Sequence, residues 1–293
     1  MEGPPNWLDM PYELMANILQ RLGTVEILNS VWKVCTTWRK ICKDPAMWKV
    51  IDVDAWDSCY SNYNLETLTK KAVDLSCGEL IDISIDGFVT DDLIDYMLLR
   101  SNKLKSLCLM SCEDITGRRL GRAVKRVPHL EKLHLSYTYQ SYLTIEDIKL
   151  IGQNCPQLKS FSMNQEFEGE YEYNDNDALA IAKNMPELRH LQVIGNNMTN
   201  IGLETILNGC PHLESLDVRR CFNLNLRGNL EKLCPEWIKD FKPPNDSMQN
   251  CGFYHLNDAF EHDMCSSGYS DVDESLECDF YEEDNFFWRH QHF

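Results

Sequence analysis

Apolar residues recur along the middle of the chain in the pattern Leu-x-x-Leu-x-Leu, in which Ile, Val, Phe, Met or Trp sometimes replaces Leu. The copies are Trp48-Ile51-Val53, Leu80-Ile83-Ile85, Leu104-Leu107-Leu109, Leu130-Leu133-Leu135, Leu158-Phe161-Met163, Leu188-Leu191-Val193 and Leu213-Leu216-Val218. Their first positions lie 24 to 32 residues apart, and an internal period of about this length is typical of a repeat architecture. The alternation that ends each copy predicts a short strand with one apolar face.

Amphipathic segments at residues 91–100, 144–154 and 199–208 lie between these strands and predict helices. Thr144 and Thr199 are expected to cap two of these helices, and Gly209 to end one. A single strand and helix cannot bury its apolar face alone, so neighbouring units must stack. The pattern therefore predicts an α/β solenoid of about seven repeats over residues 48–243.

The repeats resemble the cysteine-containing subclass of leucine-rich repeats. Cys155 and Cys210 stand just before a proline that precedes a copy, and Cys112 and Cys221 follow a copy by three residues. At such positions a cysteine is expected to be a small buried apolar side chain rather than a metal ligand.

Residues between the apolar positions are predicted to point away from the core, because side chains alternate between the faces of a strand. Stacked strands would place them on one concave face. The candidate binding residues of this face are Ser84, Cys108, Lys132, His134, Ser162, His190, Gln192, Asp217 and Arg219. No Cys nucleophile is expected near His134 or His190. These two histidines are therefore interpreted as recognition residues and not as a general base.

The first fifty residues follow a helical period instead. Pro11 suits a helix start, an apolar stripe runs from Leu14 to Leu22, and Thr24 is expected to begin a second helix. A third helix is expected to carry Val34, Cys35, Trp38 and Ile41 and to end at Asp44-Pro45. Some forty residues cannot bury this much apolar surface, so an exposed patch, and hence a partner, is expected.

This segment, residues 7–48, resembles an F-box. The matching residues are Met10-Pro11-x-Glu13-Leu14, Ile18-Leu19-x-x-Leu22, Ile27-Leu28, Val34-Cys35, Trp38-Arg39, Pro45 and Trp48, with Met10 where Leu usually precedes Pro. Together with the repeats, the chain resembles the F-box/leucine-rich-repeat proteins over residues 7–243, and within them the plant Skp-interacting-partner-like group. Trp48 is expected to end the F-box and begin the first repeat as a stiff junction.

The resemblance implies a function. F-boxes dock on a Skp-type adaptor of a cullin-RING (SCF) ubiquitin ligase, and the repeats hold a substrate protein for ubiquitination and degradation. The implied adaptor contacts are Met10, Pro11, Leu14, Ile18, Leu19, Val31, Val34 and Trp38. The chain is then a non-catalytic subunit without a cofactor or metal, monomeric within the complex. An interaction scaffold outside the ligase, or a nuclear regulator, stays open as the alternative.

The formal net charge of −18 argues against binding to nucleic acid or to an anionic membrane surface. Most of it belongs to residues 244–293, which hold 12 acids and one base, Arg289, and are expected to be a disordered acidic tail. No secretory signal or membrane span is expected. The 13 cysteines are therefore interpreted as reduced thiols of a nuclear or cytoplasmic protein.

Two charged segments interrupt the repeats. Residues 117–126 carry five bases on one predicted convex helix, and their default interpretation is a solvated face. Residues 164–177 lengthen one repeat into an acidic loop. With Tyr137, Tyr139 and Tyr142, this loop is the candidate rim for a basic substrate segment, although flexible decoration is an equal alternative.

Overall fold

The computed structural model describes residues 10–55, 63–112, 114–136, 143–165, 173–226 and 237–248. The chain divides into two compact units, Met1–Asn245 and Asp246–Phe293. The sheet and helices below all belong to the first unit. The predicted acidic tail, 244–293, falls almost wholly outside the described residues, which end at 248.

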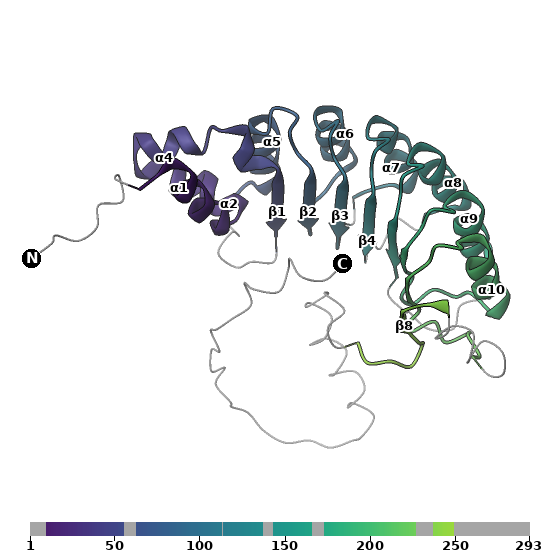
Figure 1. The fold of residues 1–293 in the computed structure, drawn as a ribbon. Helices are drawn as coiled ribbons and strands as arrows, with labels where there is room; N and C mark the ends of the chain where they lie inside the picture. The colour runs from purple at the N-terminus through teal and green to yellow at the C-terminus, as the bar shows by residue number, and fades with distance from the viewer. Residues whose placement is uncertain are drawn as a thin grey trace, which may run out of the picture. The chain divides into compact units, whose positions relative to one another are not determined.

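Eight strands form one parallel sheet, in which each strand pairs with the next one along the chain (Figure 1). They are β1 (Val50–Asp54), β2 (Asp82–Asp86), β3 (Ser106–Met110), β4 (Lys132–Ser136), β5 (Ser160–Asn164), β6 (His190–Gln192), β7 (Ser215–Asp217) and β8 (Asp240–Lys242). Strands β1 to β7 coincide with the seven copies of the apolar pattern, so these predicted strands are confirmed. β8 has no predicted counterpart, because its sequence keeps only two of the three apolar positions, Ile238 and Phe241.

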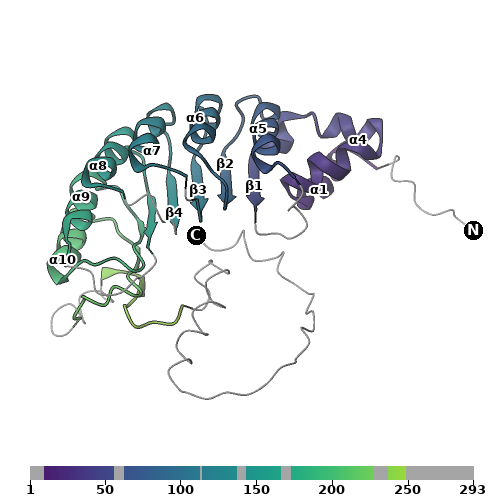
Figure 2. The same cartoon turned by 180° about the vertical axis from the view of Figure 1, so that it is seen from behind.

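Helices connect the successive strands from β1 to β7 and lie on the convex side of the curved sheet (Figures 1 and 2). They are α5 (Leu65–Leu75), α6 (Asp91–Arg100), α7 (Gly117–Ala123), α8 (Ile145–Asn154), α9 (Asn176–Asn184) and α10 (Asn200–Gly209). The side chains of Thr144 and Thr199 accept hydrogen bonds from backbone N–H groups at the starts of α8 and α10, so both predicted caps are confirmed. None of the helices in the described part of the chain has the length and apolar character of a membrane span.

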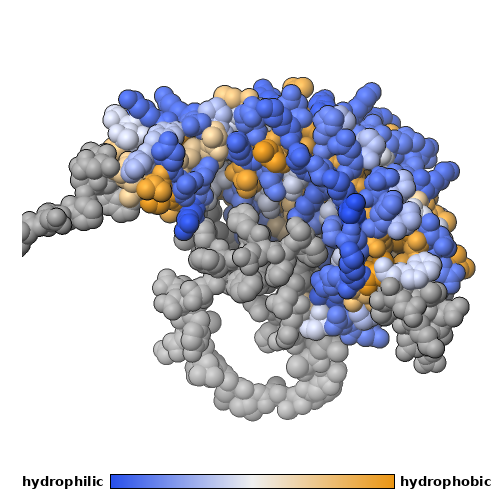
Figure 3. All heavy atoms as spheres, in the orientation of Figure 1, coloured by the Kyte–Doolittle hydropathy of each residue, from blue (hydrophilic) through white to orange (hydrophobic). Residues whose placement is uncertain are grey.

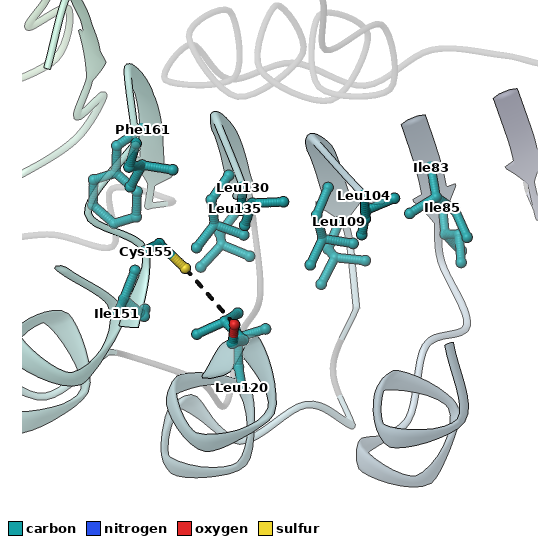
Figure 4. Packing of buried hydrophobic residues seen from close by; sticks show 14 of the residues in the cluster. Ile83, Ile85, Leu104, Leu109, Leu120, Leu130, Leu135, Ile151, Cys155 and Phe161 are labelled. Carbon is teal, nitrogen blue, oxygen red and sulfur yellow. Dashed lines mark hydrogen bonds between the residues drawn. The ribbon is translucent and has the colours of Figure 1, made fainter. Parts of the chain in front are cut away.

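The core lies between the sheet and these helices. The second apolar position of each copy pairs in register with that of the next strand. Every residue of this column is buried: Ile51, Ile83, Leu107, Leu133, Phe161, Leu191 and Leu216. Figure 4 shows Leu135 and Phe161 of the strands on the side from which Leu120 of α7 and Ile151 of α8 approach. Burial of this continuous apolar layer is what makes separate units stack.

The four cysteines at repeat positions belong to this core. Cys112, Cys155, Cys210 and Cys221 are buried, as expected. Burial raises the pKa of the Cys155 thiol to about 12 and that of Cys210 to about 11. Cys155 Sγ lies 3.9 Å from the carbonyl oxygen of Val124 in the preceding unit (dashed line in Figure 4). Thiols with raised pKa values stay protonated at neutral pH, so these side chains pack as apolar groups.

The amino-terminal segment folds into a small helical bundle. Its elements are α1 (Tyr12–Leu19), η2 (Gln20–Leu22), α2 (Thr24–Glu26), η3 (Ile27–Val31), α3 (Trp32–Val34), α4 (Thr36–Ile41) and η4 (Pro45–Trp48). Val34 ends the second helical stretch and does not belong to the third, because Cys35 is extended. The Cys35 sulfur accepts a hydrogen bond from the backbone N–H of Trp38 at 3.4 Å and so caps α4.

Trp48 joins this bundle to the first strand. Its side chain is 1% exposed, and its indole Nε1 donates a hydrogen bond to the carbonyl oxygen of Cys42 at 2.8 Å. The backbone N–H of Asp52 in β1 donates to Thr24 Oγ1 of the bundle at 3.2 Å. The Lys71 ammonium of α5 lies 4.6 Å from the centre of the Trp32 ring. The bundle and the first repeat therefore share a packed junction.

Two residues after the last apolar position of a copy, the backbone is left-handed in several repeats. Gly87 and Gly195 occupy this position with φ of 95° and 73°, but the third repeat has Ser111 there, with φ of 48°. Ser111→Gly is expected to stabilise the protein by about 0.5–1 kcal/mol, because glycine lacks the Cβ clash that disfavours this region. Urea unfolding followed by circular dichroism measures the change. Ser111→Ala is the control, and an equal gain in that variant would refute the conformational explanation.

Candidate functional site

The helical bundle exposes apolar side chains. Within the described residues, the N-terminal patch consists of Tyr12, Leu14, Ile18, Leu22 and Val34, which are 46%, 54%, 38%, 39% and 58% exposed. Leu14 and Ile18 lie four residues apart and so share one face of α1. Apolar surface over this part of the chain is visible in Figure 3. Several large exposed apolar residues on one small bundle are typical of a site for a protein partner.

Six of the eight predicted adaptor contacts are accessible. Pro11, Leu14, Ile18 and Val34 are exposed, and Met10 and Trp38 are half-buried. Leu19 and Val31 are wrong as contacts, because they are only 1% and 2% exposed. Leu19 lies one residue, or about 100°, round the helix from Ile18 and therefore faces the bundle core, which also holds Val31.

Tyr12 and Leu22 complete the patch, although the predicted contacts do not include them. The Tyr12 hydroxyl donates a hydrogen bond to Asp44 Oδ2 at 2.6 Å. This hydrogen bond raises the pKa of Tyr12 to about 12 and lowers the pKa of Asp44. The contact holds the start of α1 against the start of η4, so the patch has a fixed geometry.

The concave, helix-free face of the sheet divides into two chemically different parts. One is a hydrogen-bonded ladder, formed by Ser162, Asn164, Gln192, Asp217 and Arg219. Gln192 Oε1 accepts from Ser162 Oγ at 3.1 Å and from Asn164 Nδ2 at 3.0 Å. Gln192 Nε2 donates to Asp217 Oδ2 at 3.1 Å, and Arg219 Nη2 donates to the same oxygen at 2.7 Å. The members of the ladder therefore satisfy one another.

Three of the predicted binding residues are wrong, because the ladder buries them. Ser162, Asp217 and Arg219 are 0%, 4% and 2% exposed, so they are structural groups and do not form an open surface. Serine is too short to project past its neighbours, and the Arg219 guanidinium turns back onto the carboxylate of Asp217, two residues earlier at the end of β7. The other six, Ser84, Cys108, Lys132, His134, His190 and Gln192, are half-buried and remain on the face.

The second part is the Lys132 cluster, which we define as Lys132, His134, Ser160 and His190. His134 Nε2 lies 2.7 Å from Ser160 Oγ. Among the described residues, His190 Nδ1 is buried without a hydrogen-bond partner and Lys132 forms no ion pair. Burial, reinforced by the charges of Lys132 and His190, lowers the pKa of His134 to about 3. The His134 ring is therefore neutral at physiological pH.

Cys108 pairs in register with His134, so a thiol lies beside this histidine. Burial raises the pKa of the Cys108 thiol to about 11, while the pKa of His134 is lowered. A nucleophilic cysteine needs the opposite shifts, a lowered thiol pKa beside a protonated imidazole. The pair therefore has the electrostatics of neutral recognition groups.

Comparison with known proteins identifies the family. The F-box domain model matches residues 7–50. F-box protein SKIP19 of Arabidopsis thaliana is 44% identical over 269 residues, which cover 92% of this chain and 85% of that protein. F-box/LRR-repeat protein 22 of the same plant is 44% identical over 259 residues, which cover 88% of this chain and 83% of that protein. The chain belongs to the F-box/LRR-repeat family.

The matches differ in length. F-box/LRR-repeat protein 23 of Arabidopsis thaliana is 49% identical over 245 residues, which cover 83% of this chain and 54% of that protein. The chain thus spans about half the length of this relative.

Among solved structures, the yeast Rad7 and Elc1 complex matches with a TM-score of 0.42 and 16% identity over 75% of this chain and 64% of that chain. That likeness is too distant to add to the family assignment.

The predicted basic helix of this F-box/LRR-repeat chain is partly neutralised. Asp95 of α6 accepts hydrogen bonds from Arg119 Nε at 2.6 Å and from Arg126 Nη1 at 2.9 Å. Arg118, Arg122 and Lys125 are exposed and form no ion pair within the described ranges. Of the five basic residues in 117–126, three are therefore exposed and without an ion pair among the described residues.

The acidic loop is described only at its two ends. Residues 166–172 lie outside the described residues, as do Tyr137, Tyr139 and Tyr142, so the predicted rim stays a prediction. Asp175 has a structural role: its carboxylate accepts from the backbone N–H and the hydroxyl of Thr199, at 2.7 and 2.8 Å. No group of three or more His, Cys, Asp or Glu side chains placed to hold a metal occurs within the described ranges.

Proposed function

We propose that this F-box/LRR-repeat protein is the substrate-receptor subunit of an SCF-type ubiquitin ligase. The N-terminal patch docks on a Skp-type adaptor, which links the chain to a cullin and a RING protein. The sheet and its helices form a leucine-rich-repeat solenoid whose concave face holds the substrate protein for ubiquitination and degradation. The chain itself carries no catalytic group in this scheme and acts in the nucleus or cytoplasm.

The observation that carries the proposal is the N-terminal patch. Its five side chains are large and exposed on a bundle whose other apolar residues, such as Met15 and Leu28, are 2% and 3% exposed. When a partner covers exposed leucine, isoleucine and valine side chains, each Å² of buried apolar area contributes about 25 cal/mol to binding. A patch that faces water on an otherwise well-packed bundle is thus suited to a stable protein interface.

The packed junction at Trp48 supports the mechanism. A receptor accelerates ubiquitin transfer by holding substrate and ligase together, which makes their reaction effectively intramolecular. That gain depends on a limited range of distances between them. The buried indole and the Asp52–Thr24 hydrogen bond restrict motion between the adaptor-binding bundle and the first repeat.

Leu14→Ala combined with Ile18→Ala is expected to weaken adaptor binding at least about tenfold, because both side chains lose most of their contact area. Isothermal titration of the full chain with a purified Skp-type adaptor measures the effect. Leu179→Ala combined with Ile201→Ala is the matched control, since these residues are also exposed, by 47% and 68%, but lie on α9 and α10. Unchanged thermal unfolding of both variants ensures that only the interface has changed.

No binding of the intact chain to any Skp-type adaptor would refute the proposal. Equal losses in the two double variants would remove the N-terminal patch as the docking surface. A chain that binds the adaptor, but whose removal from cells leaves every protein at its former level, would favour a scaffold outside the ligase.

A further inference from the structure

The polar side chains of the concave face are hydrogen-bonded to one another in the ladder, but those of the Lys132 cluster are not all paired. In the ladder, Gln192 and Asp217 each contact two or more neighbouring side chains. In the cluster, the described part of the chain offers no ion-pair partner to the Lys132 ammonium and no hydrogen-bond partner to His190 Nδ1. Polar groups that a folded chain leaves unpaired in a half-buried setting are unusual, and a ligand is one explanation for them.

We propose that the Lys132 cluster binds the carboxylate of an aspartate or glutamate from an acidic segment of the protein held on the concave face. The inference rests on the proposed function, because it names the class of substrate that the receptor takes. It adds a single anchoring position, on strands β4 to β6, to a face that otherwise binds through shape.

The available groups match an acceptor that carries one negative charge. Lys132 supplies one permanent positive charge with donors only, and the Ser160 hydroxyl and the two imidazoles supply further hydrogen-bonding capacity. A carboxylate accepts at both oxygens and donates at neither, so it complements this set. Lys132 and His190 lie on either side of the short Ser160, since Ser160 pairs in register with both residues.

A phosphate group fits less well. The lowered pKa of His134, about 3, leaves its ring neutral, so Lys132 is the permanent cation of the cluster. Phosphate is commonly recognised by the planar, bidentate guanidinium of arginine. The arginine on this face, Arg219, hydrogen-bonds Asp217 through Nε and Nη2. The charge balance therefore favours a carboxylate.

Selection from a displayed library of random twelve-residue peptides tests the inference. The full chain is captured through a carboxy-terminal biotin, so that capture does not depend on the adaptor. Selected peptides are expected to share an aspartate or glutamate at one position. Changing that residue to its amide is expected to weaken binding about tenfold or more, the range for a hydrogen-bonded charge.

Lys132→Met combined with His190→Phe is expected to cause the same loss, and no further loss with the amide peptide. Arg118→Met is the matched control: it removes an exposed, unpaired cation from α7 and is expected to leave binding unchanged. Peptides without a common acidic position would overturn the inference, as would equal affinity of the intact and cluster variants. Tighter binding of a phosphoserine peptide at that position would overturn the assignment to a carboxylate.

Failure of this inference is distinguishable from failure of the proposed function. Adaptor binding without any acidic preference would remove the inference and leave the ligase role intact. An acidic preference in a chain that binds no adaptor would retain the recognition site and remove the ligase.

Discussion

Trp48→Ala is expected to lower the free energy of unfolding by about 3–5 kcal/mol, the range for truncating a fully buried large aromatic side chain. The indole is among the largest fully buried side chains within the described residues, at 1% exposure. Its loss would open a cavity at the junction and would leave the Cys42 carbonyl oxygen without the donor that now lies 2.8 Å away. Because the bundle and the first repeat share this side chain, both are expected to lose stability together.

Guanidinium unfolding, monitored by far-ultraviolet circular dichroism, measures this change. Trp237→Ala is the matched control, because Trp237 is 56% exposed and its loss is expected to cost less than about 1 kcal/mol. Trp48→Phe keeps most of the packing but removes the donor, and an intermediate loss of about 1–2 kcal/mol is expected. A Trp48→Ala loss no larger than that of the control would contradict the packed junction.

The strands of the sheet were predictable because one constraint repeats. Each copy of the pattern must bury the same three positions against its neighbours. The spacing therefore predicts one register between successive strands, beginning with Ile51 opposite Ile83. β8 carries that signal only in part. Its sequence keeps two of the three apolar positions, Ile238 and Phe241, and has Pro243 in place of the third, while Phe241 pairs in register with Leu216. The incomplete copy left this strand out of the prediction.

The accessible residues of the helical bundle were less predictable. Ile18 and Leu19 are adjacent and both apolar, so the stripe they form is wider than the core that it meets. Which of the two faces the core depends on how α1 packs within the bundle, and the helical period of α1 alone does not contain this information. When a small bundle has apolar residues on most sides of its helices, its sequence does not show which of them form the core and which the interface.

On the concave face, alternation predicts the direction of a side chain but not its burial. Ser162 points to the predicted face and is covered there. Asp217 and Arg219 did carry a usable signal: they are two residues apart, at the end of a predicted strand, and opposite in charge. The Lys132 cluster had no equivalent signal, because its unpaired state depends on what its neighbours in β3 to β6 leave unsatisfied.

Arg219→Met is expected to destabilise the protein by about 3 kcal/mol, because it leaves the Asp217 carboxylate buried without its partner. The pair is almost fully enclosed, with side chains 2% and 6% exposed and 2.7 Å between Arg219 Nη2 and Asp217 Oδ2. Gln192 Nε2, at 3.1 Å, the backbone N–H of Arg219, at 3.2 Å, and the more distant Lys242 Nζ, at 4.0 Å, are the other described donors near that carboxylate. None of these replaces the charged hydrogen bonds that the guanidinium makes.

Asp217→Leu in the same chain as Arg219→Met is expected to recover most of that loss, because apolar side chains of similar size cost little where a buried ion pair is removed whole. Urea unfolding of the two single variants and the double variant gives the coupling energy. Arg189→Met is the control for an exposed pair, since the Arg189 side chain is 52% exposed beside Glu214, and a change below about 1 kcal/mol is expected. If Arg219→Met matched this control, the ladder would be a solvated surface, and Arg219 would return to the residues available for recognition.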